Sequence, residues 1–285
     1  MMQAPDIGGL IFEHTADAHA LELPFVGHVP LPRWAPVHVG PVTVDLSPTK
    51  HVVFLLLAAF LVWLTMWLAG RALERQRTRG SGAPKGMASA IEAMVLFVRD
   101  DVAIANIGHN GAKFAPYILT LFWFVLYCNL LGLLPFGATA TGNLAVTGAL
   151  ALTALLTIEI SGLVALGPKG YARTIVFVPP GTTGVTAVLL TLIMIPVELI
   201  GKLVKTFALM LRLFANMTAG HFVILSLMGL IFIFGLLSIA RWAIAGGSVA
   251  FMVFMYALEL LVAVLQAYIF ALLTSVFIGL MQHEH

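Results

Sequence analysis

Charged residues are scarce in this chain. Only 10% of its 285 residues are Asp, Glu, Lys or Arg, whereas a typical soluble domain has about 25%. Hydrophobic residues make up 60%, and the mean hydropathy is +1.02. This composition excludes a soluble globular domain and predicts a protein that crosses the lipid bilayer several times. The net charge is only +2 and comes from loops rather than a basic face, so nothing favours nucleic-acid binding.

Disulfides, metal-ligand clusters and a secretion signal are also missing from the sequence. The single cysteine, Cys128, excludes an intrachain disulfide framework and is predicted to be a small buried hydrophobe. Residues 1–49 lack the basic-then-apolar pattern of a cleavable signal peptide. The histidines near the N-terminus have no metal-ligand spacing, which favours a solvated loop; they are His14, His19, His28, His38 and His51. We expect no metal and no cofactor.

Long apolar runs are abundant instead. Three are close to the roughly 20 residues with which one helix crosses about 30 Å of hydrocarbon, and two in the C-terminal third are longer than one perpendicular crossing. The runs are 51–70, 114–134, 144–166, 182–239 and 246–280. They predict an all-α membrane protein with about five membrane-embedded helices.

The last two helices, within 182–285, are expected to form a long hairpin. Since each run exceeds a single crossing, each helix either breaks or is steeply tilted in the bilayer. Pro196 is a candidate for a bend in the first of them. We expect Gly246–Gly247 to begin the second.

Basic loops predict the orientation of the chain. Arginines and a lysine after the first membrane helix (51–70) place loop 71–113 in the cytoplasm, so segment 1–50 lies outside. The second and third membrane helices fall within 114–167. Basic residues likewise place loop 168–181 in the cytoplasm. The C-terminus is then cytoplasmic too.

One part of the first cytoplasmic loop has its own pattern. Residues 87–107 carry apolar residues at helical spacing, interrupted by Glu92 and by charges at 99–101. The pattern predicts an amphipathic helix on the cytoplasmic membrane surface, with a re-entrant segment as the alternative.

Arg212 is the most informative single residue. Every residue within three positions of it is apolar, and no carboxylate is near in sequence. A guanidinium cannot be deprotonated in a protein, so this run carries a fixed positive charge at membrane depth. Such a charge normally marks an ion pathway or a partner carboxylate. The lack of a nearby acid suggests that the partner belongs to another chain.

Arg212 belongs to a polar stripe on its predicted helix. At about 100° per residue, the stripe occupies an arc of roughly 80°; its members are Glu198, Lys202, Lys205, Arg212 and Asn216. His221 lies about 140° from Glu198 by the same rotation and faces other surroundings. In the last helix, Glu259 and Gln266 are two turns apart and share a face. Together these groups predict a polar passage inside an apolar hairpin.

Structural interpretations of these residues stay open. Lys202 and Lys205 could place their amines at the membrane interface, and Glu198 could pair with Lys202 one turn away. His221 could be a hydrogen-bonded packing residue. Glu159 is equally compatible with a helix contact and a channel role. Asn129 is expected to join helices by hydrogen bonds.

Three strings in the sequence carry a resemblance. They are Leu211-Arg-Leu-Phe-Ala-Asn-Met-Thr-Ala-Gly-His221, Leu265-Gln-Ala-Tyr-Ile-Phe-Ala-Leu-Leu273 and Asn129-Leu-Leu-Gly-Leu-Leu-Pro135. The chain from Met87 to the C-terminus closely resembles subunit a of the F-type ATP synthases. The N-terminal third resembles bacterial members more loosely, through residues 12–19.

The resemblance implies a stator in the bacterial plasma membrane, next to a rotating ring of c subunits, with a b-type peripheral stalk and the rest of the Fo and F1 sectors as further partners. It implies that Arg212 faces a ring carboxylate and that two half-channels connect this carboxylate to the two sides. By position, Asn216, His221, Glu259 and Gln266 match residues of the outer half-channel, and Glu198 matches one of the cytoplasmic half-channel. The subunit itself is expected to be a non-catalytic proton channel.

One departure is weighed beside this resemblance. Many bacterial members have Glu where this chain has His221 and His where it has Glu259, so the order of proton relay is open. Either sodium or protons could be the coupling ion, and protons are the default.

Two rival functions are weighed. A self-contained secondary transporter would use Arg212 to bind an anionic substrate, but no internal repeat is visible. A non-transporting anchor subunit would leave the polar residues unexplained.

Overall fold

The computed structural model describes most of the chain. The described residues are 17–23, 27–39, 42–45, 47–78, 86–134, 137–176, 184–234 and 240–283. The chain divides into two compact units. The first unit comprises Met1–Met66, Trp123–Val146 and Leu213–Ala267, and the second comprises Trp67–Phe122, Thr147–Arg212 and Tyr268–His285.

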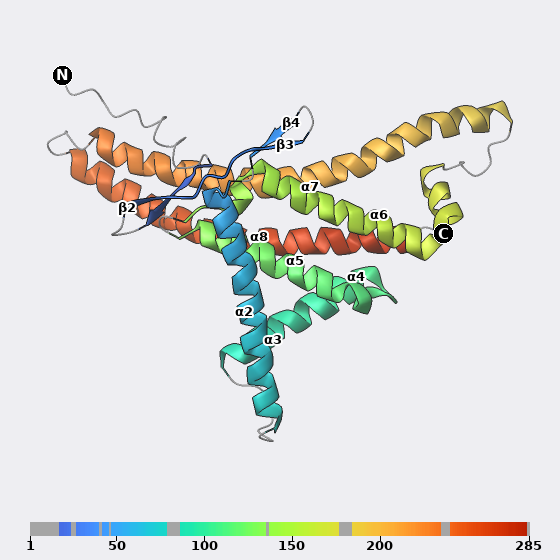
Figure 1. The fold of residues 1–285 in the computed structure, drawn as a ribbon, viewed down its shortest axis with the longest axis horizontal. Coiled ribbons are helices and arrows are strands. Elements are labelled where there is room, and N and C mark those ends of the chain that lie inside the picture. The colour runs from blue at the N-terminus through green and yellow to red at the C-terminus, as the bar shows by residue number, and fades with distance from the viewer. Residues whose placement is uncertain are drawn as a thin grey trace. The chain divides into compact units, whose positions relative to one another are not determined.

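The structure is predominantly α-helical, as the apolar runs predicted (Figure 1). Five of the described helices are long and apolar enough to cross a membrane. They are α2 (Lys50–Thr78), α5 (Gly111–Gly132), α6 (Leu144–Ile175), α7 (Val185–Phe234) and α8 (Ala240–His283). The fold class predicted from the sequence is confirmed.

The two C-terminal helices do not break in the described residues. α7 runs through Pro196 as one helix of 50 residues, which is about 75 Å at 1.5 Å per residue. α8 has 44 residues and begins at Ala240. The prediction that Gly246–Gly247 begins this helix is wrong, since both glycines lie inside it. A steep tilt of both helices in the bilayer stays a prediction.

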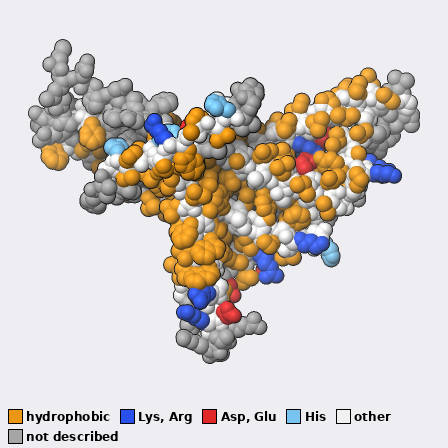
Figure 2. Space-filling view, viewed as in Figure 1, with side chains coloured by type: hydrophobic (Ala, Val, Ile, Leu, Met, Phe, Trp, Pro, Cys, Tyr) orange, Lys and Arg blue, Asp and Glu red, His pale blue; other side chains and the backbone are white. Residues whose placement is uncertain are grey.

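α2 shows why these helices suit hydrocarbon. Large apolar side chains on its surface are exposed, among them Leu56 (61%), Phe60 (52%) and Trp63 (58%). Its exposed charges, including Arg71 and Arg75, come in the final turns. Figure 2 shows hydrophobic side chains covering α2, with Lys and Arg side chains gathered at its end. Such a surface is stable only when lipid or another apolar partner covers it.

The segment predicted as an amphipathic helix is helical throughout. α3 (Met87–Phe97) continues as a π-helix, η1 (Val98–Ile104), and then as α4 (Ala105–Ile107). Asn106 donates to the carbonyl of Val102 at 2.8 Å. None of the α3 side chains is buried, which fits an interfacial position. Its place on the cytoplasmic surface stays a prediction.

The N-terminal segment is more ordered than the predicted solvated loop. β1 (Ala20–Leu23) and β2 (Gly27–Pro30) form an antiparallel hairpin, and β3 (Val37–Val39) and β4 (Val42–Val44) form another. The solvated-loop interpretation is also wrong for His51, which is buried in the first turn of α2. Its Nδ1 lies 2.8 Å from Asp17 Oδ1. His14 lies outside the described residues.

A small core in the first unit joins α2 to α5. Ala58, Cys128, Leu131 and Ala140 are buried together. Thr65 and Tyr127 share a hydrogen bond of 2.6 Å between α2 and α5. The prediction that Cys128 is a buried small hydrophobe is confirmed.

Candidate functional site

Arg212 is exposed on α7. Apolar side chains on the same helix are also exposed, including Leu203 (61%) and Phe207 (54%). Among the described residues of its unit, no carboxylate forms an ion pair with the Arg212 guanidinium. Asn216, one turn later, is exposed as well. α7 therefore exposes a permanent cation, with the polar Lys205 and Asn216 exposed on the same side of the helix and apolar side chains exposed elsewhere on it.

The first unit contains an acid–imidazole pair. His221 of α7 and Glu259 of α8 face each other, with Nδ1 3.1 Å from Oε1 (α7 and α8 are orange and red in Figure 1). Glu259 is only 4% exposed. Neither of its carboxylate oxygens has a hydrogen bond of good geometry from the described residues. A buried carboxylate in this position is stabilised by the nearby imidazole, by a proton or by water.

A glycine makes room for this pair. A Cβ at Gly220, next to His221 in the chain, would come within 2.5 Å of Glu259 Oε1 and 2.8 Å of Cδ. A side chain at this position would require the Glu259 carboxylate to shift. Gly220 therefore leaves the space in which this carboxylate lies beside His221.

Oxygen atoms surround both nitrogens of the His221 ring. Nε2 lies 3.0 Å from the carbonyl oxygen of Gly132 and 3.1 Å from Thr139 Oγ1. Nδ1 lies 3.0 Å from the carbonyl oxygen of Met217. A carbonyl can only accept, so either ring nitrogen can donate to the carbonyl next to it, and both can donate when the ring is protonated. Nδ1 is the nitrogen next to Glu259 Oε1.

Further polar groups of the first unit fix the helices around this pair. Asn129 is fully buried, donates to the Ala263 carbonyl at 3.1 Å and accepts from Thr141 at 2.7 Å. The expectation that Asn129 joins helices by hydrogen bonds is confirmed. Tyr256 donates to the Leu133 carbonyl at 3.2 Å. Gln266, two turns after Glu259 on α8, is 5% exposed.

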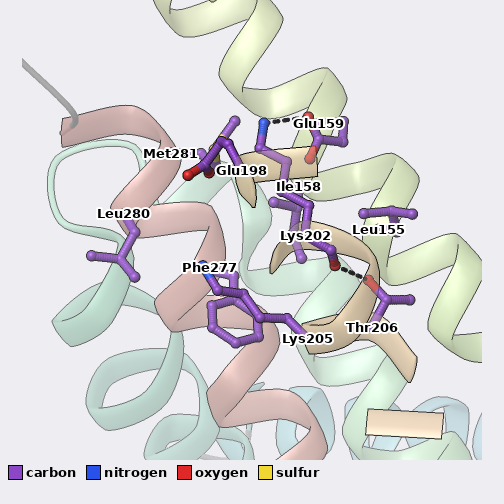
Figure 3. Close-up of a pocket in the computed structure, with 10 residues that line it drawn as sticks. All are labelled: Leu155, Ile158, Glu159, Glu198, Lys202, Lys205, Thr206, Phe277, Leu280 and Met281. Atoms are coloured by element: carbon purple, nitrogen blue, oxygen red, sulfur yellow. Dashed lines mark hydrogen bonds and ion pairs between the residues drawn. The ribbon is translucent and has the colours of Figure 1, made fainter. Parts of the chain in front are cut away.

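The second unit contains a separate charged pocket of about 50 Å³. It is lined by side chains of α6, α7 and α8, the charged ones being Glu159, Glu198, Lys202 and Lys205 (Figure 3). A cavity needs about 10–15 Å³ of such volume to hold one water molecule, so water fits here. Glu198 is partly buried, and Lys205 lies 5.5 Å from the centre of the Phe277 ring.

The partner of Lys202 is not Glu198, the acid weighed from the sequence. Its Nζ lies 3.3 Å from Glu159 Oε2, and its side chain is 12% exposed. Among the described residues, the Glu198–Lys202 ion pair weighed from the sequence is not formed. Placement of the Lys202 amine at the membrane interface stays a prediction. The hydroxyl of Tyr171 donates to the same oxygen of Glu159.

Sequence reasoning missed the neutral groups that complete both polar sites. Thr139, Gly132 and Gly220 contact the His221–Glu259 pair, and Tyr171 contacts Glu159. These residue types are common in any membrane helix or turn. No spacing signal in the sequence distinguishes them.

Comparison with known proteins places the chain in a family. Residues 46–279 match the family described as ATP synthase A chain. The chain is 46% identical to ATP synthase subunit a of Chloroherpeton thalassium over 272 residues, which is 95% of this chain and 76% of that protein. It is 46% identical to ATP synthase subunit a of Myxococcus xanthus over 246 residues, 85% of this chain and 76% of that protein. It is 43% identical to ATP synthase subunit a 2 of Chlorobaculum tepidum over 273 residues, 96% of this chain and 72% of that protein. A match over this much of its length, together with five membrane-length helices, shows that the chain belongs to the ATP synthase A chain family and is a multi-pass membrane protein.

Proposed function

We propose that this chain is the proton-conducting stator subunit of an F-type ATP synthase. In this proposal it forms two half-channels to a carboxylate on a ring of c subunits and couples proton flow to ring rotation. One observation carries the proposal. Arg212 is a permanent cation exposed on α7, a helix that exposes many large apolar side chains, and it has no carboxylate partner among the described residues of its unit.

The exposed face of α7 suits a moving acid on a neighbouring chain. A carboxylic acid in lipid stays protonated because loss of water penalises its charged form, so it can cross hydrocarbon as a neutral group. Next to Arg212, the cation favours the ionised form and the proton leaves. The same cation repels a proton that would pass directly between the half-channels. Arg212 is therefore both the release group and the seal.

The outer half-channel is assigned to Asn216, His221, Glu259 and Gln266. Its support is the 3.1 Å contact between His221 and the buried Glu259. Imidazole titrates near neutral pH, and a carboxyl group next to it can take up or release the same proton. This arrangement suits proton transfer at membrane depth better than it suits packing.

The cytoplasmic half-channel is assigned to Glu198. Its support is the water-sized pocket that Glu198 lines in the second unit. Protons leaving the ring carboxylate would pass through this pocket to the cytoplasm during ATP synthesis, and in the opposite direction during ATP-driven pumping.

Coupling by rotation follows from the size of the driving force. A proton crossing about 100 mV gains about 2.3 kcal/mol, which is too little to make one ATP. Several protons must therefore contribute to each synthetic event. We assign the chain a c-ring, a b-type peripheral stalk and the rest of the Fo and F1 sectors as partners. The subunit is non-catalytic and lies in a bacterial plasma membrane, with its N-terminus outside and its C-terminus in the cytoplasm.

The test is Arg212→Ala in the whole complex, reconstituted into vesicles. We expect ATP-driven proton pumping to be abolished, because the ring acid is no longer induced to release its proton. Passive proton conductance through the membrane sector should persist or grow, because the seal is lost. Arg71→Ala is the matched control, since Arg71 is exposed near the end of α2 and its guanidinium lies 4.4 Å from the centre of the Trp67 ring. Unchanged coupled pumping in Arg212→Ala would refute the assignment.

Copurification separates the rival functions. A stator subunit requires a multimeric ring of small subunits and a stalk in the purified complex. A secondary transporter that binds an anion at Arg212 requires neither. Isolation of this chain as an active transporter on its own would overturn the proposal.

A further inference from the structure

Glu159 is the centre of a polar cluster to which the proposed function gives no role. It lies on α6, in the second unit, and its Oε2 accepts a hydrogen bond from the Tyr171 hydroxyl. The Lys202 ammonium of α7 lies 3.3 Å from the same oxygen. A phenol and an ammonium group thus both contact one carboxylate oxygen, between two helices that are long enough to cross a membrane.

The cluster holds the Lys202 amine in one place. Tyr171 lies beyond a kink in α6, where Gly167 has a φ of 69° and Pro168 follows. Its hydrogen bond to Glu159 therefore ties together the two parts of α6 on either side of the kink. The Lys202 amine also lies 5.0 Å from the centre of the Tyr171 ring. A carboxylate and an aromatic ring each stabilise an ammonium group at such distances.

Lys202 has a second acid within reach. Glu198 precedes it by one helical turn, and Glu followed by Lys at this spacing is the favourable order for an ion pair along a helix. Figure 3 shows the Lys202 side chain running to Glu159, with the Glu198 carboxylate pointing away from that pair. Among the described residues of the unit, Glu198 has no ion pair or hydrogen bond from its side chain. The competition between two acids for one lysine is resolved in favour of Glu159.

We propose that Glu159 is a positioning residue that holds Lys202 away from Glu198 and so keeps the Glu198 carboxylate free to exchange protons with water. This inference rests on the proposed role of Glu198 in the cytoplasmic half-channel. The titratable groups that line the pocket are Glu159 on α6 and Glu198, Lys202 and Lys205 on α7. Tyr171 on α6 contacts Glu159 and the Lys202 amine. α8 contributes Phe277, Leu280 and Met281, which do not titrate. If the Lys202 amine were not paired with Glu159, it could move next to the Glu198 carboxylate and place a positive charge there.

The test begins with Glu159→Gln in the whole complex. The amide can still accept the Tyr171 hydrogen bond but cannot form an ion pair with Lys202, which is released to pair with Glu198. A nearby cation changes the proton affinity of a carboxylate by about tenfold or more. We expect ATP-driven pumping at neutral pH to fall about tenfold. Its pH profile, measured by varying pH on the cytoplasmic side, should shift toward lower pH, because a paired carboxylate needs a higher proton concentration to be protonated.

The double variant Glu159→Gln with Lys202→Gln separates positioning from a merely structural role. If the released lysine causes the defect, removing it should return the pumping rate to within about threefold of wild type and restore the pH profile. Loss of helix packing alone predicts that the double variant is as defective as the single one. Glu74→Gln, an exposed acid at the end of α2, is the control for a lost carboxylate elsewhere. All rates are expressed per assembled complex.

Each outcome is decisive. An unchanged pH profile in Glu159→Gln, or no rescue in the double variant, overturns the inference. If Glu159→Gln does not assemble because the Lys202 charge is left unpaired, the double variant lacks that charge and should assemble. A wild-type pH profile of pumping in the double variant then supports the inference. Failure of the double variant to assemble, or an altered profile, overturns it. Arg212→Ala keeps the two proposals distinguishable, because its result does not depend on Glu159.

Discussion

At the scale of single residues, the His221–Glu259 pair shows how a membrane protein can store a proton. Both ring nitrogens face carbonyl oxygens, Nε2 that of Gly132 and Nδ1 that of Met217, so both can donate when the ring is protonated. Nδ1 also lies 3.1 Å from Glu259 Oε1, so a proton can pass between these two groups. The pair is either an imidazolium with a carboxylate or a neutral imidazole with a carboxylic acid. Both states carry the same net charge, so the exchange does not move charge far in a medium of low polarity.

Replacement of Glu259 by glutamine tests this arrangement. The amide has nearly the same volume, so the α7–α8 contact at Gly220 should survive, but the side chain can no longer take up a proton. Positioned proton-transfer groups commonly contribute about a hundredfold or more to a rate. We expect ATP-driven pumping to fall by about that factor, measured in vesicles with the intact complex.

Tyr256→Phe is the control for the glutamine variant. It removes the hydroxyl that donates to the Leu133 carbonyl, one turn before Glu259, and keeps the aromatic ring. Its pumping should stay within about threefold of wild type. Pumping within twofold of wild type in Glu259→Gln would show that the carboxyl group is not on the proton path.

At the scale of elements, close contact between helices depends on particular glycines. In the second unit, Gly279 of α8 packs against the backbone of Asn106 in α4, and a Cβ there would overlap the Asn106 carbonyl. Backbone cannot move aside as a flexible side chain can. Overpacking of this kind costs about 1–3 kcal/mol. The close contact between Asn106 and α8 is thus possible because Gly279 has no side chain.

Gly279→Ala should therefore destabilise the second unit. We expect thermal unfolding of the detergent-solubilised complex to begin at a lower temperature, with faster proteolysis in the α3–α4 region. Gly246→Ala in the same helix is the matched control, because no atom of the described residues lies within 4 Å of its added Cβ. It should be neutral or slightly stabilising, since alanine favours a helix over glycine by about 1 kcal/mol. Equal stability of the two variants would contradict the packing argument.

The elements differ in how well the sequence predicts them. The five long helices could be predicted because unbroken apolar runs leave few other structures in lipid. The prediction that α8 begins at Gly246 is wrong for an energetic reason. Ending a helix in lipid leaves backbone N–H and C=O groups without hydrogen bonds, at a cost of several kcal/mol each. A glycine inside a helix costs less than that. The π-helix at Val98 was not predictable from apolar spacing, and the short N-terminal strands were missed in a polar segment.

The same limit applies to the candidate site. Arg212 could be identified from the sequence because a charge inside an apolar run is visible without any knowledge of its contacts. The choice of Lys202 between Glu198 and Glu159 could not be predicted, since Glu159 lies 43 positions away. Local spacing favoured the acid one turn away. Only the packing of α6 against α7 in the second unit identifies Glu159 as the partner of Lys202.

At the scale of the whole molecule, the orientation of the chain decides which half-channel opens to which side. The basic loops predict that Arg33 lies outside and Lys169 in the cytoplasm. Both side chains are exposed. Between them lie α2, α5 and most of α6, three helices that are long and apolar enough to cross a membrane, so we expect three crossings. An odd number of crossings requires the two residues to be on opposite sides of the membrane.

Cysteine labelling can test this orientation, because Cys128 is the only cysteine and is 1% exposed. The unaltered chain should therefore resist a membrane-impermeant maleimide until it is denatured, which provides the background for single introduced cysteines. We expect Arg33→Cys to be labelled only in right-side-out vesicles and Lys169→Cys only in inverted ones. The opposite pattern would reverse the two half-channels, so that Glu198 would lie toward the outer side and His221 toward the cytoplasm. Labelling of both cysteines from the same side would contradict three crossings, and one of the helices α2, α5 and α6 would then not span the membrane.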